Sequence, residues 1–307
     1  MSEQHEQDPC ASLRKEVERL RNRLKVLSSP LKVLLKRRGF QVFSKEPTAY
    51  LLIPSKRHLH GFYAMLGKYS FRLFLRDVIN HRDFFTLQSV TRYATEAVTG
   101  EYIGYLHSIG LIRKRGAGYA VCSRSVRSFG ETLEWYVAEV FRREFSADTL
   151  WGVTFKGRKT GGDYDVIAGM EGLICYTEVK SSPPKQIYAS EVSAFLDRVS
   201  DLSPEIAIFL MDTELRMRDK IVPMFEAELA HRKTGATTVE RIEKELFHTG
   251  NRIYIINAKD SISGNIQTVL NRYYRERSAI TEGGALQARA VEETGLHRVR
   301  NVMRKYV

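Results

Sequence analysis

The sequence predicts an α/β fold in which a mixed sheet is flanked by helices and follows a mainly helical region. Two observations predict it. In the second half of the chain, short runs rich in β-formers, such as 206–211 and 252–256, alternate with longer amphipathic patterns. Before residue 110, helical spacing of apolar residues dominates instead. With 307 residues, 43% of them hydrophobic, the chain is long enough for two domains with a sizeable core.

The first predicted helix has a heptad-like pattern. From Leu13 to Leu27 its apolar residues stand alternately four and three apart, and Pro30 ends it. About two heptads are too few for an independent coiled coil. We therefore expect the helix either to pair within a homodimer or to dock on its own domain. Beyond it, the runs 41–43 and 49–53 predict a β-hairpin.

Residues 68–123 predict helices followed by a basic hairpin. Thr95 is placed to cap the third helix, and strand patterns on either side of a glycine turn occupy 110–121, with Arg113, Lys114 and Arg115 on the first strand. This pattern resembles a winged helix-turn-helix domain. The resemblance implies that the third helix lies in a DNA groove and that the three basic residues contact phosphates.

The third helix also carries Glu96 and Glu101 and few basic groups, which disfavours reading of bases. Docking on a protein is the alternative function for this region.

A longer amphipathic helix is predicted over 131–145. Its apolar stripe contains a carboxylate, Glu134, which lies about 60° from Val137, whereas Glu131 lies at the margin of the stripe. A charge inside an apolar stripe needs a partner or a function. The alternatives are that Glu134 reaches the rim or pairs with an arginine.

Two further strand patterns form a predicted hairpin, 165–168 and 173–180. Alternation places Glu178 and Lys180 on one face of the second strand, and Asp165 begins the first strand where the second one ends. The hairpin thus gathers two carboxylates and an ammonium group at one edge. Oxygen ligands of this kind suit Mg²⁺, which polarises a phosphodiester and lowers the pKa of a bound water. The alternative is a Glu178–Lys180 pair on a solvated strand.

Asp165, followed thirteen residues later by Glu178-Val179-Lys180, resembles the motif of the PD-(D/E)xK nuclease superfamily. The resemblance implies a restriction-endonuclease-like core in which Asp165 and Glu178 hold Mg²⁺ or Mn²⁺. It also implies that the Val179 carbonyl and Glu134 are further metal ligands and that Lys180 positions the attacking water.

A basic loop precedes this hairpin and carries Lys156, Arg158 and Lys159. We expect it to grip the substrate backbone; the alternative is a solvated turn.

Composition points to a polyanionic partner and a reducing compartment. The 48 basic residues exceed the 36 acidic ones by 12, although a basic surface also serves solubility. The three cysteines are scattered, and no apolar run approaches the about 20 residues needed to span a bilayer. We therefore expect a cytoplasmic protein with DNA as its partner and no membrane, which leaves open an association with the nucleoid.

The predicted domains are a basic N-terminal helix (1–30), a winged-helix-like DNA-binding or docking domain (31–125), a PD-(D/E)xK nuclease domain (126–280) and a basic tail (281–307). The predicted function is that of a Mg²⁺-dependent deoxyribonuclease of the endonuclease type. The alternative is a non-catalytic DNA-binding or assembly protein with a retired nuclease fold. RNA as substrate, the form of the DNA, sequence specificity and a role in defence or repair stay open.

Overall fold

A computed structural model describes residues 10, 12–13, 15–20, 30–158, 160, 162–232 and 238–278. The chain divides into two compact units, one ending at Ile262 and the other beginning at Ser263. Residues 12–13 and 15–20 are helical, as the heptad pattern predicts, but Leu24 and Leu27 of that pattern lie outside the described residues. Lys159 and the tail 281–307 also lie outside them. In the described part of the chain, no helix is both long and apolar enough to cross a membrane.

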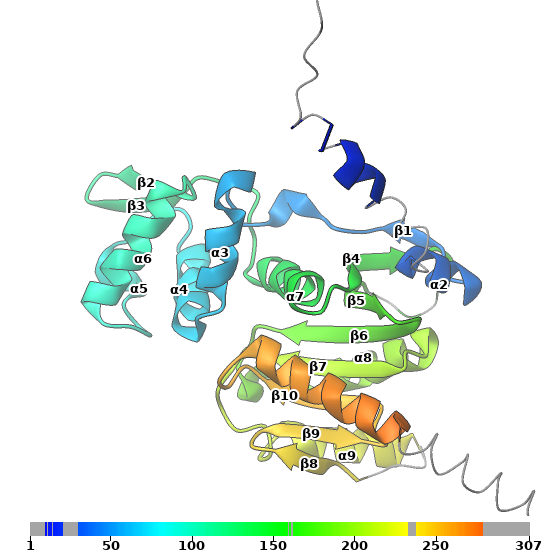
Figure 1. Cartoon of the computed structure of the whole chain (residues 1–307). Helices are drawn as coiled ribbons and strands as arrows, with labels where there is room; N and C mark the ends of the chain where they lie inside the picture. Colours follow the sequence, from blue (N-terminus) through cyan, green and yellow to red (C-terminus); the bar gives the residue numbers. More distant parts are fainter. Residues whose placement is uncertain are drawn as a thin grey trace, which may run out of the picture. The chain divides into compact units, whose positions relative to one another are not determined.

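An eight-stranded mixed sheet forms the centre of the first unit (Figure 1). The spatial order of its strands is β1-β4-β5-β6-β7-β10-β9-β8. β4, β5 and β6 form an antiparallel meander, β7 runs parallel to β6, and β10 runs parallel to β7. The strands are β1 (Val42–Ser44), β4 (Asp148–Phe155), β5 (Tyr164–Met170), β6 (Leu173–Lys180), β7 (Ile206–Met211), β8 (Glu240–Glu243), β9 (Leu246–Thr249) and β10 (Ile253–Asn257).

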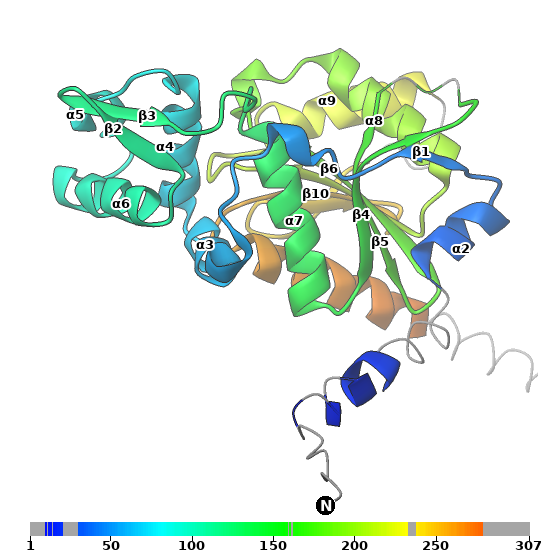
Figure 2. The same cartoon turned by 90° about the horizontal axis from the view of Figure 1, so that it is seen from above.

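Helices cover both faces of this sheet (Figure 2). α7 (Gly130–Glu144) packs on β4, β5 and β6, whereas α8 (Ala189–Leu202) and α9 (Ile221–His231) cover the opposite face. α2 (Leu31–Arg37) joins the core that α8 and α9 form with the sheet. The chain order α7, β4, β5, β6, α8, β7 is consistent with a restriction-endonuclease-like core, and the expected fold class is confirmed.

The central strands are buried on both faces because helices lie above and below them. All six residues of β7 are buried, and only the last residue of β6 is partly exposed. Such strands consist of continuous apolar runs rather than alternating patterns, and burial of such runs is the main stabilising term of the fold. Tyr176, Phe195 and Phe225 form a contiguous aromatic cluster with Phe209 between α8, α9 and the sheet.

A helical region precedes the sheet meander in the chain. Its elements are α3 (Leu59–Leu66), α4 (Tyr69–Asn80), α5 (Leu87–Val90), α6 (Glu96–Ser108) and a hairpin of β2 (Ile112–Arg115) and β3 (Gly118–Val121). Thr95 caps α6 by accepting a hydrogen bond from the Val98 amide, as predicted. Phe85, between α4 and α5, pairs with Tyr119 and so adds an extended residue to the hairpin.

Two arginines of α4, one buried and one partly exposed, bind the ends of two sheet strands. Arg72 Nε donates to Asp212 Oδ1 at 2.8 Å just beyond β7, and both side chains are almost completely buried. Arg76 Nη1 donates to the Ser181 carbonyl at 2.9 Å just beyond β6. The helical region is therefore held at the same end of the sheet at which β6 and β7 finish.

The predicted hairpin at 41–53 is wrong. Val42 pairs with Phe155 of β4 instead, while Thr48–Tyr50 is a single 3-10 turn. Strands β8 and β9 were not predicted from the sequence. In the second unit, residues 263–278 are helical (orange in Figure 1).

Candidate active site

Three elements bring the predicted catalytic residues to one end of the sheet. Val166 of β5 pairs with Thr177 of β6, so the next pair in the same register sets Asp165 opposite Glu178. Asp165 Oδ2 accepts a hydrogen bond of 2.7 Å from the Val179 amide, which fixes that carboxylate against the end of β6. Glu134, on α7, is close enough for its charge to act on Asp165.

Glu178 is 1% exposed and is surrounded by donors. Arg198 of α8 donates from Nη2 to Oε1 at 2.7 Å and from Nε to Oε2 at 3.2 Å. Tyr176 donates its hydroxyl to Oε2, and the Lys180 ammonium lies 2.9 Å from Oε1. Burial opposes ionisation of Glu178, but Lys180 and Arg198 outweigh it and lower its pKa. The carboxylate is therefore ionised, and both of its oxygens are occupied.

Lys180 stays protonated in this environment. Burial alone would lower the pKa of its ammonium, but Glu178 more than compensates and the pKa is raised. Its Nζ also lies 3.2 Å from Oε1 of Glu191 on α8. A lysine that keeps its proton can orient a water or offset the charge of a phosphodiester, but it cannot serve as the proton acceptor.

Burial and neighbouring carboxylates disfavour the charged forms of Glu134 and Asp165. Burial, followed by repulsion from Asp163, Glu131 and Glu178, raises the pKa of Glu134 to about 8. Burial, followed by the charges of Glu178 and Glu134, likewise raises the pKa of Asp165. Within the described residues, no hydrogen bond or ion pair reaches the Glu134 carboxylate.

This donor set fits a hard divalent cation in its chemistry. A cation held by Glu134 and Asp165 would favour their ionised forms, which burial and neighbouring carboxylates disfavour. Carboxylate oxygens are the ligands that Mg²⁺ and Mn²⁺ prefer. Among the described residues, however, no three acidic, histidine or cysteine side chains already stand around one point. Glu178 would have to exchange one of its present partners before it could become a ligand.

The predicted nucleic-acid contacts lie in two places. In the loop after β4, Lys156 is exposed. Arg158 is held by Asp201 at 3.2 Å and by the Gly39 carbonyl at 3.2 Å, with its guanidinium over the Phe40 ring. Arg158 therefore has structural partners of its own in this arrangement.

On the hairpin, Arg113, Lys114 and Arg115 are all exposed. Alternation along β2 puts Lys114 on one face and the two arginines on the other. The three residues therefore do not form one surface.

Sequence reasoning missed the residues that hold Glu178. Arg198 lies three residues after Phe195 and four before Leu202, which are both buried, so it stands inside the apolar stripe of α8. A buried arginine in such a stripe needs a carboxylate partner, and this signal was available in the sequence. Tyr176 shares the face of Glu178 by alternation, but nothing in the pattern distinguishes it from an ordinary core tyrosine.

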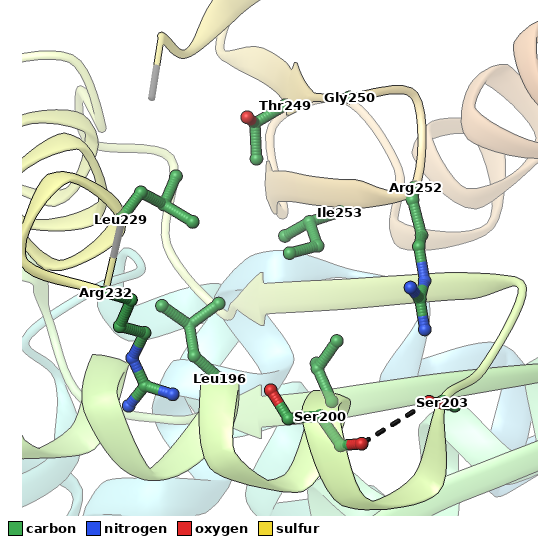
Figure 3. A pocket seen from close by; sticks show the side chains of 10 residues that line it. Leu196, Ser200, Ser203, Leu229, Arg232, Thr249, Gly250, Arg252 and Ile253 are labelled. Atoms are coloured by element: carbon green, nitrogen blue, oxygen red, sulfur yellow. Dashed lines mark hydrogen bonds between the residues drawn. The ribbon is translucent and has the colours of Figure 1, made fainter. Parts of the chain in front are cut away.

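An apolar pocket of about 250 Å³ lies elsewhere, between α8, α9 and the turn that joins β9 to β10 (Figure 3). Leu196, Leu229 and Ile253 form much of its wall, and Arg232 and Arg252 stand at its sides. The lining contains no carboxylate, so it is not the candidate catalytic site.

Solved structures similar to this chain include the following two. Can2 from Sulfobacillus thermosulfidooxidans, in complex with cyclic tetra-adenylate, is 15% identical with a TM-score of 0.47, over 80% of this chain and 60% of that one. Protein VC1899 from Vibrio cholerae is also 15% identical, with a TM-score of 0.38, over 61% of this chain and 53% of that one. This chain thus spans less than two thirds of either protein, and the likeness concerns the fold alone. No protein-family model and no curated protein matches the chain.

Proposed function

We propose that the protein is a nuclease that requires a divalent metal ion and hydrolyses phosphodiester bonds of DNA. One observation carries the proposal: Glu134, Asp165 and Glu178 come from three different elements to one end of the sheet, with Lys180 beside them. Bringing buried carboxylates together lowers the stability of the fold unless a bound cation offsets their repulsion. Such clusters are therefore typical of functional sites.

In this proposal, Asp165 and Glu134 hold Mg²⁺ or Mn²⁺, with Glu178 and the Val179 carbonyl as further ligands. The metal supplies Lewis acidity and lowers the pKa of a bound water. Lys180, which keeps its proton, orients the water and offsets negative charge on the scissile phosphate. Arg198 holds Glu178 ionised and in place, and therefore acts as a positioning residue.

The test is a cleavage assay on duplex, single-stranded and branched DNA and on RNA, with Mg²⁺, Mn²⁺ or a chelator. The proposal expects cleavage that needs the metal and that Lys180→Ala and Glu178→Ala abolish, while binding of the nucleic acid persists in chelator. Cleavage that continues in chelator would contradict it, as would variants that cut at the wild-type rate.

The order of elements before the meander suggests how DNA is bound. A helix, an extended residue, two helices and a hairpin follow one another from α4 to β3, which is the order of a winged-helix domain. We propose that this region binds the DNA substrate outside the catalytic site.

A non-catalytic protein is the second candidate, and one observation favours it. Arg198, Tyr176 and Lys180 occupy both oxygens of Glu178. In a nuclease fold that had lost its activity, such partners would neutralise a carboxylate that no longer binds a metal ion. The same assay separates the two candidates, because a retired nuclease would bind DNA but yield no product with either metal.

A further inference from the structure

We propose that a basic pocket on the outer face of the β2–β3 hairpin, away from α6, binds the phosphodiester backbone of a nucleic acid. The pocket has a volume of about 540 Å³. Arg82 and Asp83 come to it from the α4–α5 connection, Arg113 and Arg115 from β2, and Ser123 and Arg124 from the segment after β3. We take nucleic acid as the ligand from the proposed function, on which this assignment rests.

Strand alternation decides which face of the hairpin the pocket occupies. Tyr119 pairs with Lys114, and its ring contacts His107 on α6, so this side of the hairpin faces α6. Arg113 and Arg115 project from the other side. They are two residues apart on one face, roughly 7 Å along the strand, and so can reach separate phosphate groups.

The four arginines of the pocket have no carboxylate partner among the described residues. The Arg115 guanidinium donates to the Asp83 carbonyl at 2.6 Å, and that of Arg82 to the Arg127 carbonyl at 3.4 Å. Such bonds orient a guanidinium but leave its charge uncompensated. Among the described residues, none forms a hydrogen bond or an ion pair with the side chain of Arg113 or Arg124.

Arginines elsewhere in the described chain commonly pair with acids. Arg142 and Arg143 share Glu139, and Arg232 contacts Glu228 at 2.8 Å. Four guanidinium groups and one carboxylate, that of Asp83, line the hollow, so positive charge is in excess and an anion placed among the arginines would reduce their mutual repulsion. The rigid fork of the guanidinium matches the oxygens of a phosphate group.

The lining also indicates which part of a nucleic acid enters. No aromatic side chain lines the pocket, so it offers no ring on which a base could stack. Ala120 and Val121 supply its only aliphatic side chains. The pocket therefore recognises phosphate without reading sequence.

This placement differs from insertion of α6 into a groove. α6 has exposed Glu96 and Glu101, whose charges repel phosphates. The outer face of the hairpin has a net excess of positive charge instead. We infer that the nucleic acid lies along the outer face of the hairpin and does not contact α6.

The test compares two neighbouring residues of one strand. Arg113→Ala and Lys114→Ala remove the same charge from exposed positions, but on opposite faces of the hairpin. Binding of a fluorescent DNA duplex of mixed sequence is followed by anisotropy, in chelator, between about 50 and 200 mM salt. Circular dichroism checks that the variants are folded.

We expect Arg113→Ala combined with Arg124→Ala to weaken binding several-fold. The double variant should also lower the slope of the logarithm of the binding constant against the logarithm of salt concentration by about 1 to 2, since each duplex phosphate contact contributes about 0.9 to it. Lys114→Ala should leave the slope unchanged. Equal effects of Arg113→Ala and Lys114→Ala would overturn the assignment to the outer face, and an unchanged slope in the double variant would overturn the pocket.

Two competitors identify the source of the phosphate. Inorganic phosphate and ATP at millimolar concentration should fail to displace the duplex. Displacement by either one that depends on Arg113 and Arg124 would overturn the backbone assignment in favour of a small phosphate ligand. Binding of an acidic peptide but not of DNA would overturn it in favour of a protein partner. Because binding is measured in chelator, these outcomes are independent of whether the protein cleaves DNA.

Discussion

Replacing Glu134 with glutamine tests the electrostatics of the site without any substrate. In the folded protein, burial and neighbouring carboxylates raise the pKa of this residue from 4.5 to about 8. Between these values the folded state binds a proton that the unfolded state has lost. The free energy of unfolding therefore falls as the pH rises through this window. Glutamine does not titrate, so the variant escapes this fall.

The size of the effect follows from the shift. About 3.5 pH units at about 1.4 kcal/mol each set an upper limit of about 5 kcal/mol. Water reaches a half-buried carboxyl and relaxes part of this cost, so we expect about 2 to 3 kcal/mol. In metal-free solution, Glu134→Gln should therefore match the wild type near pH 5 and exceed its stability by that amount near pH 8.5.

The assay is urea unfolding in chelator at several pH values. Glu131→Gln is the matched control, because it lies one turn earlier on α7, where its carboxylate accepts a hydrogen bond from Ser128. Its stability difference from the wild type should not grow with pH in the same way. If the difference in unfolding free energy between Glu134→Gln and the wild type were constant from pH 5.5 to 8.5, the raised pKa of Glu134 would be refuted.

Three further predictions concern the partners of the buried charges. Arg198→Leu leaves Glu178 buried without its guanidinium and should cost about 3 to 5 kcal/mol in urea unfolding; a loss below about 1 kcal/mol would contradict it. Asp212→Asn removes the charge that compensates buried Arg72 and should cost a similar amount, with faster proteolysis of the helical region; unchanged proteolysis would show that this pair does not hold α4. Mn²⁺ affinity should rise up to about tenfold per pH unit below about pH 8, because the metal displaces one proton from Glu134, and then level off; a flat profile in calorimetry would exclude that proton.

The sequence alone predicted the elements whose structure follows from the local pattern of residues. The bounds of β6 and β7 were predicted to the residue, because both segments are rich in β-formers and β7 is a continuous apolar run. α7 was found because its apolar residues recur at the helical period, and Glu134 was recognised as a carboxylate inside that stripe. Asp165 and Glu178 were placed together because a short turn sets the register of their strands.

The sequence was insufficient where a segment depends on distant partners. β1 pairs with Phe155, more than a hundred residues away, so a local pattern favoured a hairpin that does not form. β8 carries few apolar residues, and it is a strand because β9 lies beside it. The two faces of the β2–β3 hairpin could have been separated from alternation alone, but the basic run was treated as one patch.

Binding of Mn²⁺ to the metal-free protein tests the central claim most directly. Calorimetry at pH 8 should find a site that Asp165→Asn weakens at least tenfold, because a hard cation loses a carboxylate ligand. Asp201→Asn, whose carboxylate accepts a hydrogen bond from Tyr164 on the same strand as Asp165, is the control and should bind Mn²⁺ like the wild type. If the wild type binds no Mn²⁺, or if Asp165→Asn binds it equally well, the carboxylates at this end of the sheet are not a metal site.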